Sequence, residues 1–142
     1  MIPARRGAVC LLLALVVTPT YGQVMFNCGA SEGYSYYLSG ALASPENEGW
    51  VEDGIGQGGI QLLRDGTDYD IIYTDALGGR SAKADGGRVI GFEADSGTMV
   101  LVVYPNVVET YQFNPTSRKV VWTQNKAHPI SRKIAAFVSQ CQ

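Results

Sequence analysis

The fold is decided by the stretch TMVLVVYPNVVETYQFNPTSRKVVWTQ, residues 98–124. It contains three runs rich in β-branched and aromatic residues, the types that favour strands. Two turn signals separate the runs, Pro105-Asn106 and the longer segment Asn114–Arg118. Such a pattern is typical of an antiparallel meander, so the rest of the chain is expected to extend or cover this sheet.

The three runs differ in how their side chains alternate. Met99–Tyr104 is apolar on both faces, which predicts a central strand buried on both sides. Val107–Phe113 alternates, and Glu109 interrupts its apolar face, so Glu109 is predicted near a rim of the sheet. Pro105 cannot adopt the positive φ of a type I′ turn, so a type II turn with Asn106 in the left-handed position is predicted.

Other segments before the meander also carry local signals. Ile60–Arg64 and Tyr69–Thr74 flank an Asp-Gly-Thr-Asp turn and predict a hairpin, and Arg88–Glu93 predicts a short strand. Ser44-Pro45-Glu46 is typical of a helix start but is followed closely by a glycine, which predicts a single turn. Ala76–Gly87, rich in glycine and polar residues, is expected to be a long loop.

The tail Ser131–Cys141 fits either helical or strand periodicity, and a strand that completes the sheet is favoured. The predicted fold is therefore all-β, or β-rich α+β. It is a single antiparallel meander of about six to eight strands that forms a small sandwich or barrel.

The N-terminus has the features of a secretory signal peptide. Arg5 and Arg6 give a positive start, Ala8–Val17 is an apolar run too short to span a bilayer, and Thr20-Tyr21-Gly22 suits a cleavage site. Residues 1–22 are therefore expected to be a signal peptide and residues 23–142 a single β-rich domain. The predicted location is the periplasm or the medium, with an uncleaved anchor as the alternative.

Two cysteines remain after removal of the signal peptide, Cys28 and Cys141, one near each end of the mature chain. In an oxidising compartment such a pair predicts a disulfide that joins the two ends. No Cys-x-x-Cys motif is present, which argues for a structural rather than a redox role.

Charge is distributed unevenly along the mature chain. Without Arg5 and Arg6, nine basic and thirteen acidic residues remain, a net charge of −4. Such an acidic chain without a basic stripe is not expected to bind nucleic acid. Residues 46–75 hold eight acids and residues 118–133 five bases. Attraction between these segments within the fold is favoured over a basic patch for an anionic partner.

Several motif matches lack the structural context that their chemistry needs. The glycines of Gly54–Gly59 have the dinucleotide-binding spacing, but a β-like run follows where a helix is required. Ser31 lies in a Gly-x-Ser-x-Gly sequence with no preceding central strand, and His128 is the single histidine. The acids of the Asp65–Asp70 turn lack the spacing of an EF-hand, so no calcium site is predicted there. No catalytic residue, metal site or cofactor is predicted.

An aromatic cluster is the best candidate for a binding surface. Tyr34, Tyr36 and Tyr37 lie in a strand-like run and Trp50 follows it. Tyrosines of this kind commonly cover a small core with their hydroxyls in water, and that alternative stays open.

Some motifs resemble those of a set of small exported proteins of proteobacteria. They are Trp50-x-x-Asp-x-Ile-x-x-Gly58, Leu63-Arg64, Tyr69-Asp-Ile71, Asp75, Asp85-Gly-Gly, Val89-Ile90, and Lys133 leading to Cys141. The resemblance covers most of the mature chain. It implies an exported β-rich domain and a strand at the tail, and it carries no activity.

The paired cysteines are also similar to those of periplasmic lysozyme inhibitors. Those proteins carry a Ser-Gly-x-x-Tyr loop, whereas Val100 occupies the last position after Ser96-Gly97 here.

We expect an exported, non-enzymatic protein that binds an unidentified protein or envelope component. The alternatives are a carrier of a small apolar ligand inside a β-barrel, a lysozyme-inhibitor-like protein, and an enzyme that uses His128 with a carboxylate.

Overall fold

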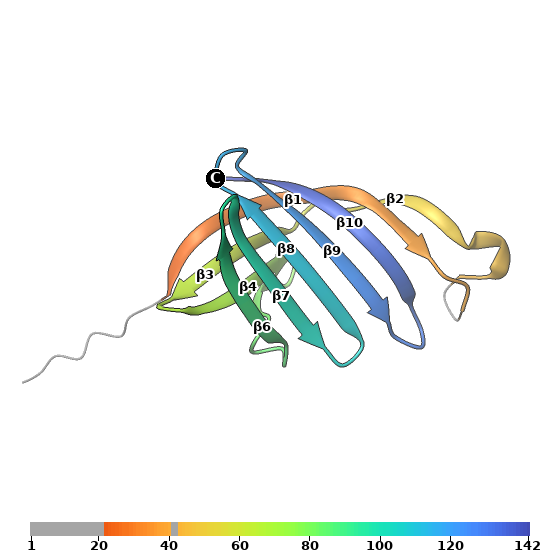
Figure 1. Cartoon of the computed structure of the whole chain (residues 1–142). Helices are drawn as coiled ribbons and strands as arrows, with labels where there is room; N and C mark the ends of the chain where they lie inside the picture. Colours follow the sequence, from red (N-terminus) through yellow and green to blue (C-terminus); the bar gives the residue numbers. More distant parts are fainter. Residues whose placement is uncertain (1–21, 41–42) are drawn as a thin grey trace, which may run out of the picture.

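The computed structural model describes residues 22–40 and 43–142, and Figure 1 shows that strands dominate this part of the chain. The strands are β1 (Gln23–Tyr37), β2 (Gly49–Ile55), β3 (Gly59–Asp65), β4 (Asp68–Asp75), β5 (Gly78–Ser81), β6 (Arg88–Ala94), β7 (Gly97–Tyr104), β8 (Val107–Asn114), β9 (Lys119–Ala127) and β10 (Arg132–Cys141). A single 3-10 turn, η1 (Pro45–Asn47), precedes β2, as the local signal predicts. The predicted signal peptide lies almost wholly outside the described residues.

All ten strands belong to one antiparallel sheet, which curls into a half-barrel (Figure 1). The strand order is β5-β4-β3-β1-β10-β9-β8-β7-β6, and β2 pairs with β1. The all-β meander is confirmed, and so is the strand at the tail, because β10 pairs along its length with β9. The expected number of six to eight strands is too low, since β2 and β5 were not predicted as strands.

β1 is long enough to pair with two strands along the same edge. Its first half pairs with β3 and its second half with β2, so β2 and β3 form one return strand that is interrupted at residues 56–58. On its other edge β1 pairs with β10, with a register shift between Cys28 and Ser31. Bulges and breaks of this kind increase local twist and let a sheet curl.

The three strands of the central meander are present, with β7 starting earlier and β9 ending later than predicted, and two further details differ. In β7, Thr98, Val100 and Val102 are buried while the alternating residues are only partly buried, so the strand is not buried on both faces. The reason is that a half-barrel encloses only its concave face. Asn106 does not have a positive φ, since Arg118 is the single described non-glycine residue with one, and the β7–β8 turn is therefore not type II.

The expected long loop at Ala76–Gly87 contains a short strand. A two-residue turn brings Gly78 opposite Asp75, and β5 then pairs with β4 as far as Ser81. Gly78 has a φ of 111°, a conformation that glycine adopts at little cost. Gly78 and Gly79 therefore lie in an edge strand after the Ala76-Leu77 turn, and residues 82–87 remain outside the strands.

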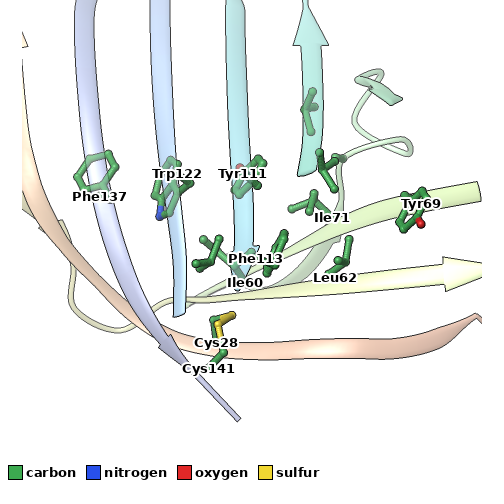
Figure 2. Packing of buried hydrophobic residues seen from close by; sticks show 14 of the residues in the cluster. Cys28, Ile60, Leu62, Tyr69, Ile71, Tyr111, Phe113, Trp122, Phe137 and Cys141 are labelled. Atoms are coloured by element: carbon green, nitrogen blue, oxygen red, sulfur yellow. A yellow bond between two sulfur atoms is a disulfide. The ribbon is translucent and has the colours of Figure 1, made fainter. Parts of the chain in front are cut away.

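Aromatic side chains form the centre of the concave core. Figure 2 shows Tyr111, Trp122 and Phe137 in a row on β8, β9 and β10. Their ring centroids are 5.6 Å and 4.4 Å apart, and the rings are stacked. Cross-strand aromatic contacts of this kind stabilise a sheet beyond the area they bury.

The curl of the sheet brings β4, the second strand from one end, into contact with β6 at the other end. The Tyr69 hydroxyl donates a hydrogen bond to Glu93 at 2.6 Å. Its ring packs over Gly91, where an added Cβ would lie 2.4 Å from a ring carbon. Glycine at this position therefore lets the ends of the sheet approach each other closely.

The predicted disulfide between Cys28 and Cys141 is present and joins β1 to β10. The two residues face each other directly in the register of these neighbouring strands (Figure 2). A disulfide is typical of proteins in oxidising compartments outside the cytoplasm. Within residues 22–40 and 43–142, no helix has the length and apolar character needed to cross a bilayer.

Candidate binding surface and concave cleft

Three of the four aromatic residues singled out from the sequence lie together on the convex face. Tyr34 and Tyr36 share this face because successive side chains of β1 alternate. Trp50 on β2 is directly opposite Tyr36 in register, and their rings meet edge to face at 5.4 Å. Trp50 is 64% exposed and Tyr34 58% exposed. We call Tyr34, Tyr36 and Trp50 the aromatic patch.

A groove of about 440 Å³ adjoins the aromatic patch. Apolar side chains flank it on the same convex face, and among them Val121 and Ile134 are each about half exposed. The two charged residues that line it, Glu32 and Glu52, are both acidic. The full lining is Glu32, Gly33, Tyr34, Glu52, Val121, Ala136, Phe137 and Val138.

Tyr37, the fourth predicted surface residue, is separated from the other three. It lies on the opposite face of β1, where its hydroxyl donates to Asp53 at 3.4 Å. The Lys133 ammonium lies 5.4 Å from the centre of its ring. Tyr37 is therefore part of a polar cluster on the concave side and does not extend the aromatic patch.

Asp53 is the acceptor at the centre of that cluster. It accepts hydrogen bonds from the Ser35 hydroxyl at 2.6 Å and from the Lys133 ammonium at 3.1 Å. Burial raises the pKa of Asp53, but the hydrogen bonds from Ser35 and Lys133 outweigh it and the net pKa is lowered. The Asp53–Lys133 ion pair also joins the acidic and basic segments, as the charge pattern predicts.

Glu109 is buried on the concave face and not at a rim, which corrects the prediction made from its strand. Only 5% of the residue is exposed. It accepts hydrogen bonds from the Tyr73 hydroxyl, from Tyr111 at 2.8 Å and from the Gln124 amide at 2.8 Å. Tyr111 lies on β8 itself and Gln124 on the neighbouring β9, whereas Tyr73 belongs to β4. The curled sheet therefore supplies a partner, Tyr73, that the β8 sequence cannot reveal.

The tyrosines around Glu109 are held in their neutral form. Burial is the main cause that raises the pKa of Tyr73, and the neighbouring Tyr111 and Glu109 raise it further. Burial and Glu109 likewise raise the pKa of Tyr111. Both hydroxyls therefore stay protonated at neutral pH and remain hydrogen-bond donors.

A cleft of about 270 Å³ opens beside Glu109 on the concave side. Ile55 and Gly59, on either side of the interruption between β2 and β3, are part of its wall. Of the glycines with dinucleotide-binding spacing, Gly54 lies in β2, Gly56 in the break and Gly59 at the start of β3, so a strand follows this segment. The full lining is Ser31, Ile55, Gly59, Ile60, Tyr73, Thr74, Asp75, Arg80, Glu109, Trp122 and Gln124.

The other residues considered for catalysis or metal binding have structural hydrogen bonds. Ser31 lies within β1, where its hydroxyl is 2.5 Å from that of Ser139 and accepts from the Trp122 indole at 3.1 Å. His128 accepts a hydrogen bond from the Ile130 amide. Asp68 pairs with Lys83. In the part of the chain that the structure describes, no three His, Cys, Asp or Glu residues converge as a metal site.

Comparison with protein-family models, with curated proteins and with solved structures gives no match. Function is therefore inferred from the surfaces of this chain alone. Sequence reasoning brought together three residues of the aromatic patch, but it missed the Glu109 cluster. One signal was present, since a glutamate in the apolar face of an alternating strand either lies at a rim or needs buried donors.

Proposed function

We propose that this chain is an exported binding protein whose aromatic patch docks a partner protein with a basic surface. The observation that carries the proposal is the exposure of Trp50 and Tyr34 on one face of the sheet, where Trp50 is paired with Tyr36. Trp and Tyr are the residues most often responsible for binding energy at protein interfaces. Large exposed apolar side chains grouped on one surface commonly mark such interfaces.

Charge around the groove supports the choice of a basic partner. Glu32 and Glu52 line the groove beside Tyr34. A lysine or arginine of the partner would place its aliphatic stem on the apolar floor and its charge near these carboxylates. The net charge of −4 predicted for the mature chain would also attract a basic protein from a distance.

Position in the sheet supports docking at this place. β2 pairs with β1 along one edge, and its other edge has no strand partner among the described residues. Trp50 lies on this open edge and is reached without any rearrangement of the sheet. A partner could therefore cover the aromatic patch and the edge of β2 together.

The test is crosslinking in the producing cells, followed by identification of the crosslinked proteins. We expect wild type to capture a basic protein and the variant Tyr34→Ala/Tyr36→Ala/Trp50→Ala to lose at least about 90% of it, because truncating interface aromatics commonly costs more than ~1 kcal/mol each. A matched control is Ile90→Ala/Phe92→Ala, which removes exposed apolar side chains of the same convex face on β6.

Equal capture by wild type and by the triple variant would contradict the proposal. Loss of capture in the Ile90/Phe92 control would show that the binding surface is a different part of the convex face. The variant Glu32→Gln/Glu52→Gln tests the electrostatic contribution to partner binding. It should weaken the binding and reduce its dependence on salt.

Export itself is tested by the mass of the mature protein. Cleavage before Gln23 is expected, and an intact mass that includes residues 1–22 would support the uncleaved anchor instead. A lysozyme-inhibitor-like role predicts that the purified protein inhibits a lysozyme, a basic enzyme, and that the triple variant does not. A carrier of an apolar ligand is less favoured, since a buried carboxylate lines the cleft.

A further inference from the structure

Glu109 is a buried carboxylate that forms no ion pair with any residue in the described part of the chain. Among the residues that the structure describes, its partners are the hydroxyls of Tyr73 and Tyr111 and the amide of Gln124, all of them neutral donors. An ionised carboxylate has about four acceptor sites, so three contacts leave one free. Buried charges are normally paired with an opposite charge, because desolvation is otherwise costly.

The cleft gives a small molecule access to Glu109. Trp122 and Tyr73 line it and supply aromatic surface, and Ile60 supplies aliphatic surface. Two other charged residues also line the cleft, Asp75 and Arg80, which pair with each other at 3.0 Å. Glu109 therefore remains as the uncompensated charge of the cleft.

From these observations we infer that the cleft binds a small organic cation, with a primary ammonium group that donates to Glu109 and a carbon body that lies against Ile60, Tyr73 and Trp122. An ammonium group satisfies the free acceptor site and compensates the charge at once. Aromatic rings also attract cations through their electron-rich faces. The volume of about 270 Å³ is slightly below the range typical of drug-sized ligands, which limits the ligand to a small molecule.

The glycine-rich segment after β2 lies between two residues that form part of the wall of the cleft. The interruption at residues 56–58 leaves Ile55 and Gly59 at the cleft. At Gly59 an added Cβ would lie 3.0 Å from the carbonyl oxygen of Cys28, so the close packing around the break favours glycine.

The test uses three probes of one shape and different charge, namely benzylamine, benzyl alcohol and benzoate. Binding to the purified protein is followed by calorimetry and by the NMR signal of the Trp122 indole N–H. We expect benzylamine to bind at least about tenfold more tightly than benzyl alcohol, and benzoate more weakly than both. The indole of Trp50 lies on the convex face, and its signal is an internal control that should not shift.

Variants separate the charge of Glu109 from that of the rest of the molecule. Glu109→Gln keeps the shape of the side chain and should remove the preference for benzylamine over benzyl alcohol. Asp95→Asn makes the same change of charge in the exposed turn between β6 and β7 and should leave the preference intact. Because Glu109→Gln removes a buried hydrogen-bond acceptor, the folding of this variant is checked by thermal unfolding. If the variant does not fold, the affinities of the wild type for the three probes test the inference.

Equal affinities of wild type for benzylamine and benzyl alcohol would overturn the inference. So would a benzylamine preference that survives in folded Glu109→Gln, or the absence of a saturable shift of the Trp122 signal with any probe. None of these results depends on the aromatic patch, so the inference and the proposed function fail independently.

Discussion

At the scale of single residues, Glu109 on β8 connects its own strand and the neighbouring β9 to β4, which is distant in the sequence. Its carboxylate takes hydrogen bonds from Tyr73 on β4, from Tyr111 on β8 and from Gln124 on β9. The Tyr73 hydroxyl is also 3.0 Å from that of Tyr111. A polar network in a low-dielectric interior is stable only when each member keeps its partners, so loss of one donor should be costly.

Tyr73→Phe tests this network. The variant keeps the ring but removes one donor from a buried carboxylate, so we expect the free energy of unfolding in urea to fall by ~1–3 kcal/mol. Tyr34→Phe is the matched control, because the same hydroxyl is removed from an exposed ring, and its effect should stay within ~0.5 kcal/mol. Equal losses in both variants would mean that the network contributes nothing specific.

Asp53 predicts how stability depends on acid. Its pKa in the folded state lies below the ordinary value of 3.8. The stability that it contributes is therefore fully present above that value and is lost as the pH falls through the lowered folded pKa. We expect Asp53→Asn to be less stable than wild type near neutral pH, and the difference to shrink in strong acid.

Urea unfolding at neutral pH and again below the folded pKa of Asp53 measures this change. Asp95→Asn, an exposed carboxylate in the β6–β7 turn, is the control and should follow wild type at both values. A constant gap between wild type and Asp53→Asn at every pH would show that the Lys133 ion pair does not carry the stability.

At the scale of strands and their pairings, the disulfide fixes the closure between β1 and β10. Cys28 and Cys141 are separated by 113 positions in the sequence, and their strands are neighbours in the middle of the sheet. A crosslink over so long a loop restricts the unfolded chain strongly, with a model value of roughly 4–5 kcal/mol.

Replacing both cysteines with serine should therefore lower the free energy of unfolding by up to roughly 4–5 kcal/mol. The reduced wild-type protein should behave like the double variant in urea unfolding. If the double variant is as stable as the oxidised protein, the strand pairing alone closes the sheet and the disulfide is dispensable.

Local patterns determined which strands could be predicted. β7, β8 and β9 are rich in β-branched residues and are bounded by clear turns, so each can be recognised as a strand from a few residues of sequence. β2 and β5 contain glycines, and they are strands only because β1 and β4 offer them a free edge. The half-barrel shape depends on the register shift in β1 and on the break after β2, and both are set by pairing between distant segments.

In the candidate sites too, contacts within one strand could be predicted and contacts between distant strands could not. Alternation along β1 places Tyr34 and Tyr36 together and would also have placed Tyr37 on the other face. The cluster around Glu109 needs the curl of the sheet, which brings β4 over β8. No pattern within one strand contains that contact, so the sequence shows only an unexplained glutamate.

At the scale of the whole molecule, the strands differ in how much of the sheet supports them. β10 and β9 have partners on both sides, whereas β5 lies at one end of the sheet and β2 pairs on one edge only. Local opening is easiest where few contacts must break. The sheet should therefore loosen from β2 and β5 inward, and the aromatic patch lies partly on one of these weaker strands.

Hydrogen exchange followed by mass spectrometry tests this order. Peptides from β9 and β10 should exchange slowest and peptides from β2 and β5 fastest, because amides on unpaired edges open by local fluctuation. The measurement is repeated at low and high protein concentration as a control. Protection of β2 that rises with concentration would mean that a second copy of the chain covers the open edge and Trp50, which would compete with the proposed partner. Equal protection of β2 and β10 at every concentration would contradict the expected order.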